Sequence, residues 1–290
     1  MMIFERILHP TRLLVGAAVL LQFVGVAQAT TLNEIRSQGY IRAATANEVP
    51  YGYMDTDGTA KGIAPEVAQA VLKRIGIDDV QWVVTPFGSL IPGLLASRFD
   101  MVAAEHDILP ARCQQVLFSE PNSSYGDGLL VPRGNPKSIH SYEDIASNPS
   151  LKLAVVNGTS HLQFAEGVGV PENQLVIIAS NADAPATVLS GRADAYAAAE
   201  ATVGGLAKDN DRLETAAPFA DPVVDGKTMR SFGGFAFPKG AEDLVEAFNA
   251  ELVKFKKTDE YKNILLTYGV SESSIAASLE KAAADLCTAN

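Results

Sequence analysis

Short runs of β-branched and other apolar residues alternate with amphipathic helical patterns along most of this 290-residue chain. This alternation constrains the fold more than any other feature, because it is the signature of parallel βαβ units. Residues 64–75 place Val67, Val71 and Ile75 on one stripe of a helix, with Pro65 in the first turn, where proline is tolerated. The other elements expected in this first block are strands at 40–45, 80–84 and 100–104 and a helix at 90–97.

A second block of the same kind follows the proline- and glycine-rich segment 132–136, whose composition marks a connection. Its expected elements are strands at 151–156, 175–178 and 195–198 and helices at 160–166 and 184–189. A strand at 233–237 and helical segments at 241–256, 260–268 and 271–284 then resume the first pattern. We therefore predict an α/β protein with two lobes, the second inserted in the first.

The predicted boundaries place lobe 1 at residues 30–128 and 230–290 and lobe 2 at residues 129–229. The chain is then expected to cross between the lobes near 126–131 and near 227–233. Ligands of open α/β sheets bind beyond the carboxyl ends of the strands, and two lobes bring two such edges face to face. This arrangement predicts a cleft that closes by a hinge motion.

The first 29 residues have the order of a secretory signal peptide. Arg6 and Arg12 precede an apolar run at 13–21, and a small-x-small triplet stands at 27–29. A membrane anchor is the alternative, but the apolar run is well short of the roughly 20 residues that a spanning helix needs. We therefore predict export and cleavage after Ala29, and we exclude this segment from the fold.

The net charge limits which partners the protein can bind, and the cysteine content limits which disulfides it can form. The net charge of −11 argues against nucleic acid or an anionic membrane as a partner. The chain has two cysteines, Cys113 and Cys287, and an even count in an oxidising compartment permits one disulfide. Two unpaired thiols are the alternative. A disulfide would tie the last helix to a segment in the first half of the chain.

Residues that follow strand ends are the candidates for holding a ligand, since side chains there reach a cleft without disturbing the core. Segments 47–51 and 85–89 supply a carboxylate and two aromatic rings, and segment 105–107 supplies further carboxylates. The loop at 157–160 joins a strand to a helix whose first N–H groups suit an anion. The candidate residues are Glu48, Tyr51, Phe87, Asp107, Arg112, Gly158, Thr159 and Ser160.

These residue types together predict a small zwitterionic ligand. Arginine binds a carboxylate through its planar fork, whereas carboxylates and aromatic faces stabilise a cation. Each residue also has a purely structural interpretation, with Arg112 in a surface ion pair, Tyr51 and Phe87 as packing residues, and residues 158–160 as a helix cap. Their joint placement after strand ends favours the binding site.

The sequence offers no constellation for catalysis or for a cofactor. It contains no G-x-S-x-G elbow and no phosphate-binding loop, and His106, His140 and His161 lack the spacing of metal ligands. A metal cluster at 105–107 is disfavoured, because three adjacent residues at one strand end do not all face the same ion. We therefore predict a binding protein without a cofactor or metal, and not an enzyme.

Three segments, taken in order, resemble one known family. They are residues 112–121 (RCQQVLFSEP), 191–196 (GRADAY) and 260–264 (EYKNI) with a Tyr-Gly pair at 268–269. This pattern resembles the amino-acid-type (family 3) periplasmic solute-binding proteins of ABC importers, over almost all of the chain from Leu32 onward. The resemblance implies a type II two-lobed fold, a periplasmic location, and an inner-membrane permease and ATPase as partners. We expect a monomer, since such a protein presents both lobes to its transporter.

The resemblance also implies residue roles. Arg112 matches the family's arginine for the α-carboxylate of the ligand, and residues 158–160 match the second-lobe loop that shares this task. The family often has an acidic residue for the α-amino group where this chain has Ala199, next to Glu200. This departure puts an ordinary amino acid in doubt as the ligand.

Within the family the chain most resembles the ectoine/hydroxyectoine-binding branch, on segments 46–50, 91–94, 112–113 and 142–146 and the late Cys287. In that branch a glutamate matching Glu48 faces the cationic ring nitrogens, and aromatic residues matching Tyr51 and Phe87 box the ring. A third aromatic residue of the box is replaced here by Asp107, which suits a more polar or more cationic ligand.

The resemblance thus predicts capture of an ectoine-like zwitterion by lobe closure, with a polar or cationic amino acid as the alternative. An alternative of another class is an exported dehydratase acting on prephenate-like acids, because such enzymes share this fold. A dehydratase needs a positioned acid or base, for which Glu200 and His106 are the candidates.

Overall fold

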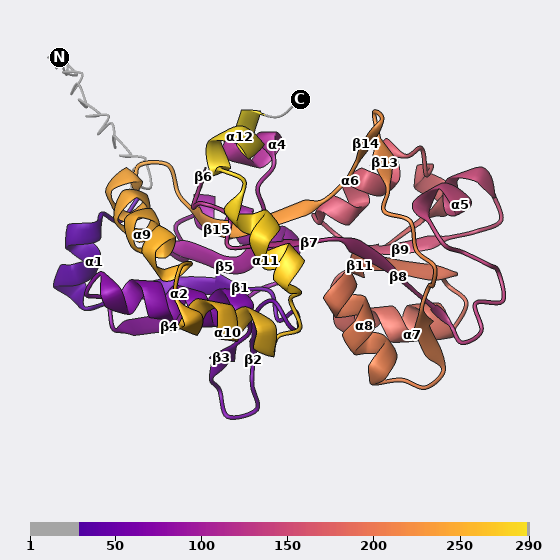
Figure 1. Ribbon diagram of the computed structural model, residues 1–290, viewed down its shortest axis with the longest axis horizontal. Helices are drawn as coiled ribbons and strands as arrows, with labels where there is room; N and C mark the ends of the chain where they lie inside the picture. Colours follow the sequence, from indigo (N-terminus) through magenta and orange to yellow (C-terminus); the bar gives the residue numbers. More distant parts are fainter. Residues whose placement is uncertain (1–28, 289–290) are drawn as a thin grey trace, which may run out of the picture.

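The computed structural model describes residues 29–288 of the chain. They form two α/β lobes along the long axis of the molecule (Figure 1). The predicted α/β class with two lobes, the second inserted in the first, is confirmed. The predicted signal peptide, apart from Ala29, lies outside the described residues. Between residues 29 and 288, no helix combines the length and the apolar character needed to cross a membrane.

Lobe 1 is built on a six-stranded sheet of order β4-β1-β5-β15-β6, with β7 paired to β15. Strand β1 runs parallel to β4 and β5, whereas β15 is antiparallel to β5, β6 and β7. The β2-β3 hairpin extends below the sheet in Figure 1. The elements of this lobe are α1 (Leu32–Gln38), β1 (Tyr40–Thr45), β2 (Tyr53–Met54), β3 (Ala60–Lys61), α2 (Ile63–Arg74), β4 (Asp79–Val84), η1 (Phe87–Ser89), α3 (Leu90–Leu95), β5 (Met101–Asp107), α4 (Pro110–Cys113), β6 (Leu117–Phe118), β7 (Ser123–Tyr125), β15 (Ser231–Phe237), α9 (Glu242–Phe255), α10 (Asp259–Thr267), α11 (Glu272–Leu279) and α12 (Ala283–Thr288).

Lobe 2 is built on a five-stranded sheet of order β10-β9-β11-β8-β12. Strand β9 runs parallel to β10 and β11, whereas β8 is antiparallel to β11 and β12. The elements of this lobe are β8 (Asp127–Pro132), α5 (Tyr142–Ser147), β9 (Leu153–Val156), α6 (Ser160–Gly167), η2 (Glu172–Gln174), β10 (Leu175–Ile178), η3 (Asn181–Asp183), α7 (Ala184–Leu189), β11 (Ala195–Ala199), α8 (Glu200–Lys208), β12 (Leu213–Thr215), β13 (Val223–Val224) and β14 (Lys227–Thr228).

The chain passes between the two sheets at two neighbouring places. Strand β7 leads through Gly126 into β8, and β14 leads back into β15, which pairs with β7 beside the first crossing. Both passages fall in or next to the segments predicted for them. The lobe boundaries themselves stay a prediction, and the one set between residues 128 and 129 falls inside β8, a strand of the lobe 2 sheet.

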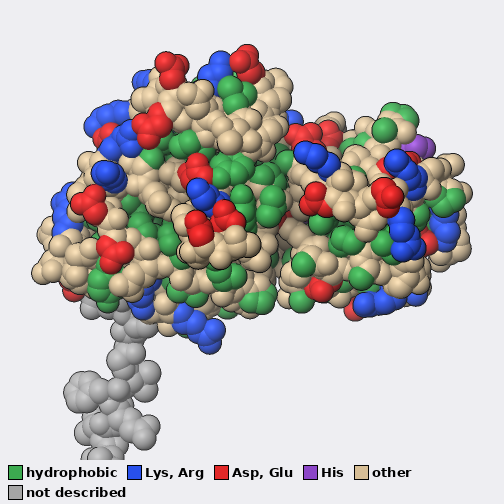
Figure 2. Space-filling model, turned by 90° about the horizontal axis from the view of Figure 1, so that it is seen from below, with side chains coloured by type: hydrophobic (Ala, Val, Ile, Leu, Met, Phe, Trp, Pro, Cys, Tyr) green, Lys and Arg blue, Asp and Glu red, His purple; other side chains and the backbone are tan. Residues whose placement is uncertain are grey.

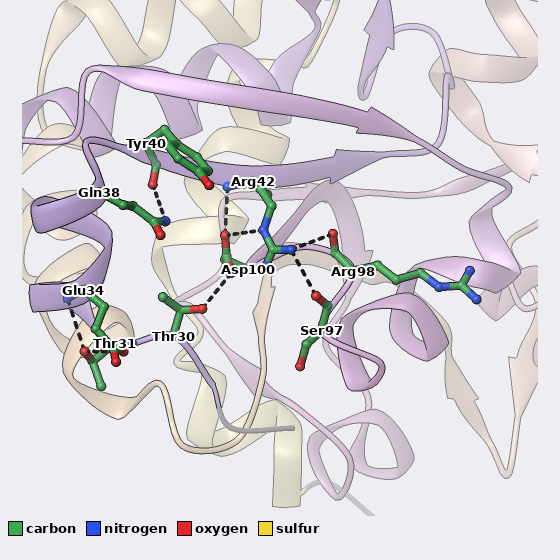
Figure 3. Close-up of polar contacts among 9 residues, drawn as sticks. All are labelled: Thr30, Thr31, Glu34, Gln38, Tyr40, Arg42, Ser97, Arg98 and Asp100. Carbon is green, nitrogen blue, oxygen red and sulfur yellow. Dashed lines mark hydrogen bonds and ion pairs between the residues drawn. The ribbon is translucent and has the colours of Figure 1, made fainter. Parts of the chain in front are cut away.

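A buried carboxylate fastens the start of the described chain to the sheet of lobe 1 (Figure 3). Asp100, just before β5, accepts hydrogen bonds from the backbone N–H and guanidinium of Arg42 in β1 and from the Thr30 hydroxyl, at 2.7–3.1 Å. Burial raises the pKa of Asp100, but the bonds from Arg42 outweigh it and hold that pKa below its usual value. The network therefore ties the N-terminal segment, β1 and β5 together.

The C-terminal end of the chain departs from the continuous helix predicted at 271–284. The structure has two helices there, α11 and α12, with a break at residues 280–282. Ala283 donates its N–H to the Glu120 carboxylate (3.0 Å), and Cys287 is joined to Cys113 of α4 by a disulfide. Of the two alternatives for Cys113 and Cys287, a disulfide or two unpaired thiols, the structure has the disulfide. Both contacts place α12 off the axis of α11 and next to α4.

Candidate ligand-binding site

A cavity lies where the carboxyl ends of strands from both sheets meet, and Figure 2 shows the narrow groove between the lobes on one face. It has a volume of about 20 Å³, which is room for about one water molecule. A solute therefore enters only with movement of the lobes or of the side chains. The lining residues are Glu48, Tyr51, Phe87, Ala104, Glu105, Asp107, Tyr125, Thr159, His161 and Ala199.

Five of the eight residues predicted to bind a ligand line this cavity, and the other three lie directly behind it. Arg112, which is 5% exposed, donates to the carbonyls of Asp107 in its own lobe and Gly158 in the other, both at 2.9 Å. The Ser160 hydroxyl donates to the Asp107 carboxylate across the cleft. The structure thus brings the predicted residues of both lobes into one connected group.

Two glycines make this close approach of the lobes possible. Gly158, with φ of +79°, has its Cα so near Gly88 of lobe 1 that an added Cβ would lie 2.8 Å from the Gly88 Cα. A side chain there would keep the lobes apart, and the positive φ also disfavours any other residue. The loop before α6 can therefore present its backbone directly to lobe 1.

The end of β5 carries two buried carboxylates that are separated in sequence by His106 and have different surroundings. Asp107 accepts a hydrogen bond from the Tyr125 hydroxyl (2.5 Å), and its Oδ2 lies 3.8 Å from Arg112 Nη1. Glu105 accepts hydrogen bonds from Asn122 and from the Ser123 hydroxyl, both in the segment that leads to the first crossing. Asp107 thus faces the cleft, whereas Glu105 also fastens the crossing segment to the sheet.

Glu48 is the predicted partner for a cation, and it lies in the loop that follows β1. Burial raises the pKa of Glu48, while the positive charge of His161 and hydrogen bonds from Asn181 and Thr202 act in the opposite direction. Because the net shift is upward, the carboxylate gains from a further positive charge placed next to it.

Aromatic rings form one wall of the cavity. Tyr51 and Phe87 were predicted, and Tyr125, which sequence reasoning missed, packs against Tyr51 with ring centroids 4.9 Å apart. Tyr125 therefore adds a third ring to the two predicted ones, although Asp107 takes the place expected for an aromatic residue. Its signal in the sequence was its position next to the predicted crossing at 126–131.

His161 is a second residue that sequence reasoning set aside. It lies in the first turn of α6, is 6% exposed and has Nδ1 3.2 Å from the Asp127 carboxylate, which also accepts from the Tyr142 hydroxyl (2.7 Å). Burial lowers the pKa of His161, but Asp127, Asp107 and Glu48 together raise it above its ordinary value. His161 thus gives the site a second group that can carry a positive charge, and it comes from lobe 2.

Of the residues considered for catalysis or metal binding, Glu105 and Asp107 line the cavity, whereas His106 and Glu200 do not. His106 packs its ring against Phe87 at 4.4 Å, and burial holds the pKa of His106 well below its ordinary value. Glu200 is exposed at the start of α8, and neither residue lines the cavity. Within residues 29–288, no group of three or more His, Cys, Asp or Glu side chains is arranged to hold a metal ion.

Glu105 makes the stability of the fold depend on pH. Burial raises the pKa of Glu105 from 4.5 to about 7. Between these values the folded protein holds a proton that the unfolded chain has released, so stability falls as the pH rises through this range. Glu105→Gln mimics the protonated carboxyl, so we expect it to lack this loss. As the pH rises from 4 to 8, its free energy of unfolding should gain about 3 kcal/mol relative to that of the wild type.

Urea unfolding of the wild type and Glu105→Gln at pH 4, 6 and 8 measures this difference. Glu246→Gln, at an exposed position of lobe 1, is the control and should leave the pH dependence of the wild type unchanged. Parallel curves for the wild type and Glu105→Gln would show that Glu105 does not titrate in this range.

Comparisons with known proteins agree with this architecture. The family model of the bacterial extracellular solute-binding proteins, family 3, matches residues 41–271. A probable amino-acid ABC transporter periplasmic-binding protein of Sinorhizobium fredii is 50% identical over 287 residues, which cover 98% of this chain and 95% of the relative. A putative ABC transporter arginine-binding protein of Escherichia coli is 32% identical over 225 residues, covering 77% of this chain and 88% of the relative.

Among solved structures, the crystal structure of EhuB in complex with hydroxyectoine superposes with a TM-score of 0.81. It is 32% identical and covers 89% of this chain and 98% of its own. The similarity therefore extends over both lobes and the cleft between them.

Proposed function

This chain belongs to family 3 of the bacterial extracellular solute-binding proteins, and on that premise we propose that it captures a small zwitterionic solute of the ectoine or hydroxyectoine type. The lobes close over the solute, and the closed protein delivers it to the permease and ATPase of an ABC importer. Relatives that are periplasmic binding proteins of amino-acid ABC transporters support the transport role. Export to the periplasm, after cleavage of residues 1–29, is part of the proposal.

One observation carries the proposed ligand class. Glu48 and the rings of Tyr51, Phe87 and Tyr125 line the same small cavity, and Arg112 lies directly behind it. A carboxylate beside aromatic faces suits a compact, delocalised cation, while the guanidinium suits a carboxylate. A ring that carries both groups matches this arrangement, and the similarity to EhuB, crystallised with hydroxyectoine, supports it.

A polar or cationic amino acid is the second candidate. Asp107 and Glu105 add two carboxylates to the lining of the cavity beyond Glu48, and an arginine-binding relative is 32% identical. These observations favour a ligand with more than one hydrogen-bond donor or positive charge.

A thermal-shift screen of the protein against ectoine, hydroxyectoine, betaines and the natural amino acids tests the proposal. A solute present at about 1,000 times its Kd stabilises the folded state by about 4 kcal/mol, which raises Tm by several degrees. We expect the largest shifts with ectoine and hydroxyectoine. Shifts confined to arginine or other amino acids would replace the proposed ligand, and turnover of prephenate or arogenate would replace the transport function.

A further inference from the structure

The carboxylate of Glu48, a residue of lobe 1, is held from the opposite lobe. Its loop is fixed by two backbone hydrogen bonds of 2.7 Å between Glu48 and Gly52. Thr202, in the first turn of α8 in lobe 2, donates its hydroxyl to Glu48 Oε1 at 3.0 Å and lies 3.2 Å from the Val49 carbonyl. Thr202 is 2% exposed, so this contact lies inside the closed cleft.

A second neutral group of lobe 2 supports the same carboxylate. The Asn181 side chain in η3 forms a hydrogen bond with Glu48, and the two residues line one small pocket. The Tyr196 hydroxyl donates to Asn181 Oδ1, so the Asn181 amide nitrogen is the donor that is left for Glu48. Thr202 and Asn181 together form what we call the lobe 2 socket.

Thr202 and Asn181 of the lobe 2 socket are both neutral, and this determines which solutes the closed cleft favours. Burying a carboxylate is costly unless a positive charge accompanies it. Among the charged groups that act on Glu48, His161 is positive and Asp107 is negative, and His161 is already paired with Asp127 at 3.2 Å. Closing the cleft therefore surrounds Glu48 with neutral donors and leaves it without a cation of its own.

We propose that Thr202 is a positioning residue of lobe 2, which holds the Glu48 carboxylate in the closed cleft so that a cationic group of the solute completes the closure. The inference rests on the proposed function, and it assigns to α8 a part in ligand selection that the sequence did not indicate. The lobe 2 socket makes closure favour solutes that carry a positive charge, because these compensate the Glu48 carboxylate enclosed between the two lobes.

Thr202→Val tests this role, since it removes the hydroxyl and keeps the shape of the side chain. The affinities of hydroxyectoine and L-arginine are measured by calorimetry, and their dissociation rates by stopped flow. We expect about tenfold weaker binding of the solute that the wild type binds, because a hydrogen bond to a charged group is lost. The loss should lie mainly in faster dissociation, since the bond forms only on closure. Thr202→Ser, which keeps the hydroxyl, should bind within twofold of the wild type.

A double-mutant cycle separates positioning of Glu48 from a merely structural effect. In the Glu48→Gln background, Thr202→Val should change affinity by less than twofold, because the charge that Thr202 holds is gone. Thr187→Val, at another buried threonine of lobe 2 outside the cavity, controls for the general cost of removing a hydroxyl and should leave affinity unchanged.

The outcomes distinguish this inference from the proposed function. Wild-type affinity in Thr202→Val, or the same tenfold loss in the Glu48→Gln background, would overturn the positioning role while the solute still binds. If the wild type binds neither hydroxyectoine nor L-arginine, the proposed function falls, and the role of the lobe 2 socket in selecting a cation falls with it.

Discussion

Arg112→Ala lowers the affinity for the captured solute by roughly 1,000-fold, about 4 kcal/mol, if Arg112 holds the carboxylate of that solute. The guanidinium is buried and is fixed by donation to the carbonyls of Asp107 and Gly158, one from each lobe. Two of its donors are thus occupied, and the others remain for a ligand. Removing the Arg112 side chain leaves the buried carboxylate of the solute without its partner. It also removes the hydrogen bond from Arg112 to the Gly158 carbonyl, which joins the two lobes.

Arg112→Lys separates charge from geometry. A lysine ammonium keeps the positive charge but cannot reach both carbonyls and a carboxylate through one planar fork, so we expect about a 100-fold loss. Arg98→Ala, at an exposed arginine of the same lobe, should bind as the wild type does. Isothermal titration calorimetry measures these affinities, and the thermal midpoint without solute confirms that each variant is folded. An affinity of Arg112→Ala within fivefold of the wild type would remove Arg112 from the site.

The fold could be predicted where apolar residues follow a clear period. Helix α7 and strand β10 lie at the predicted residues, and α2 begins and ends one residue earlier than expected. Helix α8 was not predicted because Gly204 and Gly205 interrupt its apolar pattern, and glycine is a poor helix former. Strand β8 was not predicted because its residues were interpreted as part of the crossing between lobes. Its burial depends on pairing with β11 and β12, which lie far along the chain.

The candidate site, like the fold, could be predicted from the sequence only in part. Residues at or after strand ends, such as Glu48, Phe87 and Asp107, could be placed near a cleft because the carboxyl ends of parallel strands meet at one edge. Tyr125 could not, because it reaches the site through the pairing of β7 with β15, which lies far along the chain. Thr202 could not, because its contact with Glu48 depends on how closely the second lobe approaches the first. Local patterns hold no information about this approach. The sequence therefore predicted the half of the site that belongs to lobe 1 better than the half that belongs to lobe 2.

Glu48→Gln is expected to weaken capture of a cationic or zwitterionic solute by several hundredfold or more, about 3 to 5 kcal/mol. The substitution keeps the shape of the side chain, but it removes the charge that Thr202 holds and that compensates the solute cation. Calorimetric titration with hydroxyectoine at neutral pH measures the loss. Glu172→Gln, at an exposed position of lobe 2, is the control and should bind as the wild type does.

The pH dependence of binding gives a second, independent measure of Glu48. Burial raises the pKa of Glu48 in the absence of a solute, whereas a bound cation favours its ionised form. The affinity of the wild type should therefore fall as the pH decreases through this raised pKa, because the carboxylate takes up a proton that the solute must displace. Glu48→Gln should lack this component. If the wild type and the variant lose affinity in parallel as the pH falls, the titrating group is another one, and the aromatic wall and Arg112 would then hold the solute without a charge from Glu48.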